Sequence, residues 1–181
     1  DIDEYFADEK EIQCADIGTG SGDIAIALAA EEKKVHMTAT DISESAIKVA
    51  QRNAEENGVK IDFLVGNMAE PLIEKGLKLD ILVCNPPYIP VDEQLEESVR
   101  DYEPHVALFG GSDGLQYYRE VFKAAPLLLK EKSMMAFEIG YNQKEALLKE
   151  VEAFFKGKAK GEVLKDINGK NRMLFVYFNC K

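Results

Sequence analysis

The sequence is poor in the residues that most often bind transition metals, with three cysteines and two histidines among 181 residues. Cys14, Cys84 and Cys180 stand singly along the chain, without the paired spacing of a zinc site or a disulfide framework. His36 and His105 lie far apart, in no pattern that would complete a metal cluster or a catalytic triad. We therefore expect reduced cysteines, a cytoplasmic location and no bound metal.

Long apolar runs and an excess of basic residues are also missing. No apolar run approaches the roughly 18 residues that a membrane span needs, and no stretch has the pattern of a signal peptide. Lys and Arg number 22 against 33 Asp and Glu, which gives a formal net charge of −11. A domain that neutralises many phosphates normally carries a basic patch. We therefore expect no binding to membranes and no direct binding to nucleic acid. We also expect the protein to be a monomer.

Short apolar runs alternate with helical periods along the chain, which predicts an α/β fold with one substantial core. The expected strands cover residues 12–17, 35–40, 61–65, 79–84, 134–139, 161–166 and 173–178. The expected helices begin at Asp23, cover 45–57, run from Asp113 to about Pro126, and cover 143–155. Asn168-Gly169, a favoured tight-turn dipeptide, joins the last two strands as an antiparallel hairpin. The prediction is a doubly wound, Rossmann-like, mostly parallel seven-stranded sheet that closes with this hairpin.

Two segments of the sequence show no clear period. Residues 1–11 are acidic, and we expect them to form a stub or linker before a catalytic domain of residues 12–181. Residues 86–112 form a long connection with prolines, charges and a Gly-Gly pair. A connection of that length in a compact domain is usually functional.

A glycine turn follows the first expected strand. Gly18, Gly20 and Gly22 have the spacing G-x-G-x-G, whereas the dinucleotide fingerprint G-x-G-x-x-G has its third glycine one place later. Asp23 occupies that later place, and a carboxylate at a helix N-terminus would repel a pyrophosphate. The turn therefore favours a positively charged ligand without phosphates, for which S-adenosylmethionine is the candidate.

Asp41 ends the second expected strand, about twenty residues beyond the glycine turn, where an acidic residue binds ribose hydroxyls in dinucleotide-binding folds. The alternative is a capping role for the helix that begins near Ser43. The glycine turn upstream favours the ribose role.

Asn85-Pro86-Pro87-Tyr88 follows the expected strand 79–84. The two prolines fix φ at about −65° and remove two backbone donors. The result is a stiff turn at the carboxyl end of a parallel strand, where open α/β sheets bind ligands. The Asn85 side chain and the Pro86 carbonyl can accept hydrogen bonds from both N–H groups of a planar amino group. The Tyr88 ring can cover that group. The alternative is an ordinary Asn-Pro turn.

With this turn, the chain resembles class I S-adenosylmethionine-dependent methyltransferases that modify planar nitrogens. Further blocks make it similar to the peptide chain release factor glutamine methyltransferases of the HemK type. These blocks are Ile89-Pro90, Tyr102-Glu103-Pro104, Ala107-Leu108-Phe109-Gly110-Gly111, Asp113-Gly114-Leu115, Glu138-Ile139-Gly140 and the segment DINGKNR at 166–172. The match runs from about Ile12 to the end of the sequence.

The resemblance implies methylation of the glutamine side-chain amide in the Gly-Gly-Gln loop of release factors, with S-adenosylmethionine as methyl donor. It implies a ribose contact for Asp41 and an adenine contact for Ile42. The residues expected to bind the cofactor are Asp16, Gly18, Thr19, Gly20, Gly22, Asp41, Ile42, Asn67, Met68 and Asn85. The residues expected to hold the substrate glutamine are Asn85, Pro86, Pro87 and Tyr88, of which Asn85, Pro86 and Tyr88 are the catalytic candidates.

Two features depart from that family. Asn67 stands where the family usually has an acidic residue near the adenine amino group. The family also carries an N-terminal helical domain and an Arg-Pro linker before the first strand, and only residues 1–11 precede it here. The roles of Glu103 and Glu138 stay open between orienting the substrate and satisfying backbone donors.

The same residues leave other functions open as alternatives. An adenine-N6 methyltransferase acts on the same kind of planar amino group, and a glutamine of a ribosomal protein would present the same amide. A NAD-dependent oxidoreductase is disfavoured by the glycine spacing. A non-catalytic binding domain would have no need of the complete Asn-Pro-Pro-Tyr turn.

Overall fold

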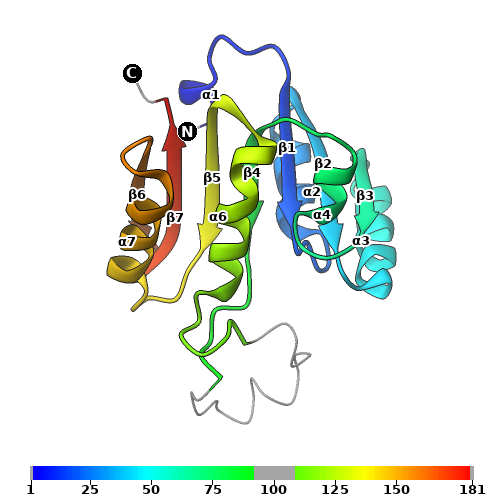
Figure 1. Cartoon of the computed structure of the whole chain (residues 1–181). Helices are drawn as coiled ribbons and strands as arrows, with labels where there is room; N and C mark the ends of the chain where they lie inside the picture. The colour runs from blue at the N-terminus through cyan, green and yellow to red at the C-terminus, as the bar shows by residue number, and fades with distance from the viewer. Residues whose placement is uncertain (1, 92–108, 180–181) are drawn as a thin grey trace.

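Seven strands form one sheet, in the order β3-β2-β1-β4-β5-β7-β6, in the computed structural model, which describes residues 2–91 and 109–179 (Figure 1). The strands are β1 (Ile12–Ile17), β2 (Val35–Asp41), β3 (Ile61–Val65), β4 (Leu79–Cys84), β5 (Leu129–Glu138), β6 (Ala159–Lys165) and β7 (Asn171–Phe178). The strands from β3 to β5 pair in parallel, and β7 runs antiparallel to both β5 and β6. The predicted mostly parallel sheet with a closing antiparallel hairpin is confirmed.

Helices cover both faces of the sheet (Figure 1). They are α1 (Ile2–Tyr5), α2 (Asp23–Glu31), α3 (Glu44–Glu56), α4 (Glu70–Glu74), α6 (Gln116–Leu128) and α7 (Lys144–Phe155). Side chains alternate across β4, so Leu82 and Cys84 pack with α4, α6 and α7, whereas Ile81 and Val83 face the side of α2. All six residues of β4 are buried, as expected for a central parallel strand.

Several boundaries differ from those predicted. Helix α4 carries no apolar period long enough to be recognised, because it has only five residues. Helix α6 begins at Gln116 rather than Asp113 and continues past Pro126 to Leu128. Pro126 lies in its last turn, where it removes only one hydrogen bond. Strand β5 begins at Leu129 rather than Met134. The sequence did not indicate its first part because the four residues after Leu129 are polar.

The acidic segment before β1 is also more ordered than its composition suggests. Phe6 is 0% exposed and packs with Ile12 and Cys14 in the core on the α2 side. The Tyr5 hydroxyl donates a hydrogen bond to the carbonyl of Phe178 at 2.6 Å. The Lys132 ammonium lies 5.5 Å and 5.7 Å from the ring centroids of Tyr5 and Phe6. One buried aromatic residue among acids leaves no periodic signal, so the sequence did not indicate this anchor.

None of the helices in the described part of the chain combines the length and the apolar character that crossing a bilayer requires.

Candidate active site

The carboxyl ends of neighbouring strands bring the predicted site residues to one edge of the sheet. In the parallel register, Ile17 of β1 lies opposite both Thr40 of β2 and Cys84 of β4. The glycine turn that follows Ile17 therefore lies between Asp41 and Asn85. The chain runs outward from β1 to β3 and then returns to β4, so β1 and β4 flank the point where the strand order reverses. Open α/β sheets bind their ligands at this point.

The segment after β3 joins the same edge. Asp41 pairs with Val65, and the Thr40 hydroxyl donates to the carbonyl of Met68 at 3.2 Å. Met68 has a positive φ of 45°, which turns the chain after the strand. The Asn67 side chain is exposed, and its amide donates to Glu70 Oε1 at 3.4 Å. The structure thus brings the segment that carries Asn67 and Met68 to the same edge of the sheet as Asp41.

The glycine turn is held from β2. The amides of Gly18 and Thr19 donate to the carbonyl of Thr40 at 2.8 Å and 2.9 Å. Gly18 and Gly20 have φ of 71° and 56°, a left-handed conformation that side chains disfavour. A Cβ placed at either residue would meet no atom within 4 Å, so the turn faces open space that a ligand can enter. Gly22, in contrast, is buried against α3, with a Cβ position 3.0 Å from Ala50 Cβ.

Asp16 lies buried at the base of the turn, with 1% of its surface exposed. The Thr19 hydroxyl donates to Asp16 Oδ2 at 2.6 Å. Burial raises the pKa of Asp16 to about 6, and the negative charge of Asp41 adds to this, while hydrogen bonds from Thr19 and the Ala25 backbone oppose it. An ionised carboxylate here is under-solvated, so the site favours a cation in front of it.

Asp41 ties the turn to the end of β2. Its Oδ2 accepts from the Gly20 amide at 2.9 Å, and its Oδ1 accepts from the Ser43 amide at 2.8 Å. The cap of α3 is Ser43, whose hydroxyl oxygen accepts from the Ala46 amide at 3.2 Å. The capping role considered for Asp41 is therefore met by its neighbour Ser43. Each carboxylate oxygen of Asp41 retains a further lone pair for a ligand.

The Asn85-Pro86-Pro87-Tyr88 turn leaves Asn85 exposed, buries Pro86 and half-buries Tyr88. Beyond it, Ile89 forms a parallel bridge with Phe109, and the Gly110 amide donates to the Ile89 carbonyl at 2.8 Å. The remaining blocks that we expected in this connection, Tyr102-Glu103-Pro104 and Ala107-Leu108, lie outside the described residues together with His105.

The hydroxyl of Tyr88 contacts a chain of charged residues that sequence reasoning left without a role. It donates to Glu138 Oε1 at 3.5 Å, and Arg172 Nη1 lies 3.8 Å from the same oxygen. Arg172 Nε also donates to Asp166 Oδ2 at 3.4 Å. Burial, followed by the negative charge of Glu138, raises the pKa of Tyr88, so its hydroxyl stays protonated and can donate. Segment 166–172 therefore connects to the turn through Glu138.

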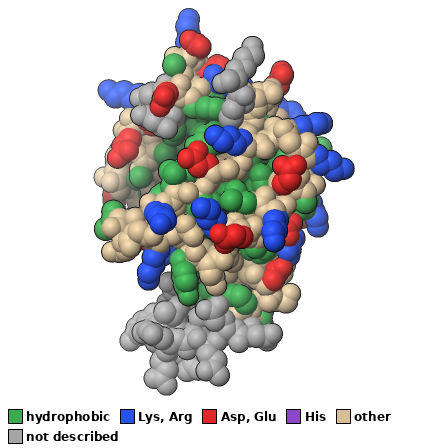
Figure 2. Space-filling model, turned by 90° about the vertical axis from the view of Figure 1, so that its left-hand side faces the viewer, with side chains coloured by type: hydrophobic (Ala, Val, Ile, Leu, Met, Phe, Trp, Pro, Cys, Tyr) green, Lys and Arg blue, Asp and Glu red, His purple; other side chains and the backbone are tan. Residues whose placement is uncertain are grey.

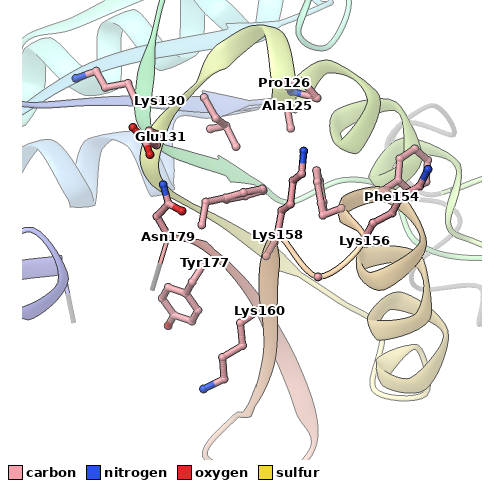
Figure 3. A pocket seen from close by; sticks show the side chains of 15 residues that line it. Ala125, Pro126, Lys130, Glu131, Phe154, Lys156, Lys158, Lys160, Tyr177 and Asn179 are labelled. Carbon is pink, nitrogen blue, oxygen red and sulfur yellow. The ribbon is translucent and has the colours of Figure 1, made fainter. Parts of the chain in front are cut away.

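A separate hollow of about 830 Å³ lies at the opposite edge of the sheet, between the ends of α6 and α7 and the end of β7 (Figure 3). Lys158 lies across it, whereas Lys160 points away (Figure 3). Lys130 on its rim is paired with Asp80 at 2.7 Å. None of the predicted site residues lines this hollow. Within residues 2–91 and 109–179, no three His, Cys, Asp or Glu side chains are grouped so as to hold a metal ion.

Comparison with known proteins agrees with this geometry. The methyltransferase small domain family matches residues 4–100. A Bacillus anthracis protein named release factor glutamine methyltransferase is 44% identical over 177 residues, which are 97% of this chain and 62% of that protein. A Bacillus subtilis protein of the same name is 44% identical over 171 residues, 93% of this chain and 59% of that protein. The chain thus spans about three fifths of the length of these relatives.

Solved structures share the fold at low sequence identity. Ribosomal protein L11 methylase from Lactobacillus delbrueckii subsp. bulgaricus is 20% identical with a TM-score of 0.67, covering 94% of this chain and 72% of that one. The N-terminal domain of human METTL16 in complex with SAH is 18% identical with a TM-score of 0.69, covering 99% and 67%. The fold is therefore the Rossmann-like fold of class I methyltransferases.

Proposed function

Because the chain belongs to the methyltransferase small domain family, we propose that it methylates the glutamine side-chain amide in the Gly-Gly-Gln loop of peptide chain release factors, with S-adenosylmethionine as donor. The name of the bacterial relatives, release factor glutamine methyltransferase, supports this substrate. We assign the catalytic domain to residues 12–181 and the activity to the cytoplasm. The free, buried thiols of Cys14 and Cys84 suit a reducing compartment.

The observation that carries the proposal is the position of the Asn85 turn beside the glycine turn. Cys84 and Ile17, the last residues of β4 and β1, are register partners, so the two turns leave the sheet side by side. A planar amide held at Asn85 would therefore face a methyl donor held at Gly18. This juxtaposition needs both turns at once, and neither alone would support methyl transfer to an amide.

The residues at the glycine turn fit S-adenosylmethionine better than a phosphorylated cofactor. The open space in front of Gly18 and Gly20 gives room for a ligand against the backbone. The buried carboxylate of Asp16 suits the positively charged end of the cofactor, and Asp41 has lone pairs for ribose hydroxyls. Asp23 is exposed in the first turn of α2, where it would repel a pyrophosphate. Ile42, 63% exposed next to Asp41, offers an apolar surface for adenine.

Methyl transfer to an amide requires the protein to position the substrate rather than to supply a strong base. An amide nitrogen is a weak nucleophile because its lone pair is delocalised into the carbonyl. When bound, S-adenosylmethionine would supply a methyl group on a sulfonium: the carbon–sulfur bond would break as the nitrogen–carbon bond forms, the sulfur would leave as a neutral thioether, and the nitrogen would release one proton to water. Asn85 Oδ1 and the Pro86 carbonyl would each accept a hydrogen bond from one N–H group of the substrate amide. These bonds would direct its nitrogen toward the methyl group. Alignment of this kind can account for about 7–11 kcal/mol of a barrier.

The protonated Tyr88 hydroxyl is fixed by Glu138, which would hold the ring over the substrate amide. Hydrogen bonds accepted by Asn85 and Pro86 would also strengthen as positive charge develops on the nitrogen. In this account the turn stabilises the transition state more than the bound substrate.

The test compares the wild-type protein with the Asn85→Ala variant on a release factor and labelled S-adenosylmethionine. We expect label transfer by the wild-type protein, and none above background by the variant. Calorimetry should give both proteins a similar cofactor Kd, because the Asn85 side chain is assigned chiefly to the substrate. Near-normal turnover by Asn85→Ala would contradict the clamp.

An RNA substrate is included in the same assay because adenine presents a similar planar amino group. The net charge of −11 weighs against a nucleic-acid substrate. On the face that bears β6, the described residues show acidic and basic side chains interspersed around apolar ones, and among them no continuous basic stripe is seen (Figure 2). Label in RNA and not in the release factor would replace the proposed substrate.

A further inference from the structure

Gln143 is a buried polar residue next to the candidate active site, and every polar atom of its side chain is engaged. It precedes α7 and is 7% exposed. Its Oε1 accepts from the Gly140 amide at 2.9 Å. Its Nε2 donates to the carbonyl of Tyr88 at 3.0 Å and to the carbonyl of Gly114 at 3.2 Å. One side chain thus links the segment after β5, the Asn85 turn and the segment before α6.

The orientation of this amide follows from its partners. The backbone N–H of Gly140 can only donate, so it requires the oxygen of Gln143. The carbonyls of Tyr88 and Gly114 can only accept, so they require the nitrogen. A carboxylate in the same place would present an oxygen to both carbonyls and could not form these bonds.

The turn needs such a donor because of its own sequence. Pro86 and Pro87 have no backbone N–H, so at these two positions the turn cannot donate a backbone hydrogen bond. Donors from other segments that bond to its carbonyls make up for this loss. Gln143 supplies that donor at the Tyr88 carbonyl, and Glu138 fixes the Tyr88 hydroxyl from the other end.

The close packing around Gln143 leaves little room for the turn to settle elsewhere. A Cβ at Gly114 would lie 2.3 Å from the Tyr88 carbonyl oxygen and 2.8 Å from Gln143 Nε2. A Cβ at Gly140 would lie 3.1 Å from Gln143 Oε1. The segments therefore approach one another so closely that they share the single amide of Gln143.

From these contacts we infer that Gln143 is a positioning residue for methyl transfer: it sets the place of the Asn85-Pro86-Pro87-Tyr88 turn through the Tyr88 carbonyl. The inference rests on the proposed function, since it concerns the turn assigned to the substrate amide. Gln143 itself touches neither the cofactor turn nor Asn85 in the contacts described above. Its replacement should lower kcat/KM for the substrate and leave the Kd for the cofactor unchanged.

The test uses Gln143→Met, which keeps the length of the side chain and removes all three hydrogen bonds. We expect kcat/KM on the release factor to fall by about tenfold to 100-fold, the scale of a small misplacement of reacting groups. The fall should lie mainly in kcat, while the Kd for S-adenosylmethionine stays within about twofold. The matched control is Val151→Ala, which truncates a buried side chain on α7, the helix that follows Gln143, away from the turn.

Val151→Ala should lower the thermal midpoint and retain kcat/KM at a temperature where the protein is fully folded. If Gln143→Met does not fold, Gln143→Asn takes its place, because it keeps a neutral amide and withdraws it by one methylene group from its three partners. Equal kcat/KM for the folded variant and the wild-type protein would overturn the inference. So would an equal loss in Val151→Ala, which would indicate a general effect of destabilisation.

Hydrogen exchange separates this inference from the proposed function, because it needs no substrate. In the Gln143 variant, the Gly110 amide, bonded to Ile89 beside the turn, should exchange faster than in the wild-type protein. The Gly20 amide, bonded to Asp41 at the cofactor turn, should keep its wild-type rate. Faster exchange at Gly110 supports the role of Gln143 even if the wild-type protein methylates no release factor. Unchanged exchange at Gly110 overturns it even if the wild-type protein is active.

Discussion

Replacing Asp16 with Asn should stabilise the unliganded protein at neutral and higher pH while weakening cofactor binding. Burial raises the pKa of Asp16 from 3.8 to about 6 in the folded protein. Such a group contributes stability below pH 3.8 and loses that contribution as the pH rises through about 6. A pKa difference of about 2 between the folded and unfolded states changes the free energy of unfolding by about 3 kcal/mol, because a pKa difference of 1 corresponds to about 1.4 kcal/mol. Asp16→Asn removes this titration. The free energy of unfolding of the variant should therefore exceed that of the wild-type protein by up to about 3 kcal/mol at pH 8.

The same charge should govern the affinity for a cationic cofactor. The wild-type protein must ionise Asp16 to face the positive charge, so affinity should fall about tenfold for each unit of pH below about 6. Asp16→Asn cannot supply the charge at any pH. Its affinity should therefore be weaker than that of the wild-type protein at pH 8 and should show no such dependence on Asp16 protonation.

Denaturant unfolding at pH 8 and near pH 4 measures the first effect, and calorimetry with S-adenosylmethionine measures the second. The control is Asp23→Asn, which removes an equal charge from an exposed position near the same turn. The stability gap between Asp16→Asn and wild type should nearly close near pH 4, and Asp23→Asn should show no gap of this kind. A gap of the same size at both pH values, or none at pH 8, would refute the assignment of a buried, destabilised carboxylate.

Three further predictions concern the glycine turn, the N-terminal anchor and the substrate clamp. Gly18→Ala should lower the free energy of unfolding by about 1–3 kcal/mol, because its backbone is left-handed, and should weaken cofactor binding in calorimetry. Unchanged affinity would show that the cofactor does not bind at this turn. Phe6→Ala should lower the free energy of unfolding by about 3–5 kcal/mol in denaturant titrations, whereas the exposed control Glu9→Ala should not; equal values would contradict the buried position of Phe6. Asn85→Asp keeps an acceptor and adds a charge, so cofactor affinity should hold or rise while turnover falls in the labelled assay; wild-type turnover would contradict an amide-specific clamp.

Local patterns were sufficient to predict most of the fold and the edge at which the site lies. The apolar run before Asn85 and the glycines after Ile17 define two parallel strands by their own sequence. Parallel strands end at one edge, and the register of Ile17 with Cys84 places the residues that follow these two strands side by side there. The mostly parallel sheet and its antiparallel hairpin were predicted on the same basis.

The remaining features depend on contacts between residues far apart in the sequence. Gln143 bonds to a carbonyl 55 positions earlier, and neither residue type signals the pair. The role of Glu138 as partner of the Tyr88 hydroxyl likewise emerges only when β5 lies beside β4. Phe6 is buried because it packs with Ile12 and Cys14, whereas its acidic neighbours suggested a stub or linker.

The most direct test of the central claim is mass spectrometry of a release factor after incubation with this protein and S-adenosylmethionine. We expect one added methyl group, located by fragmentation on the side-chain nitrogen of the glutamine in the Gly-Gly-Gln loop. A release factor whose loop glutamine is replaced should gain none. A methyl group on another residue, or an unmodified factor together with methylated RNA in the same reaction, would contradict the account.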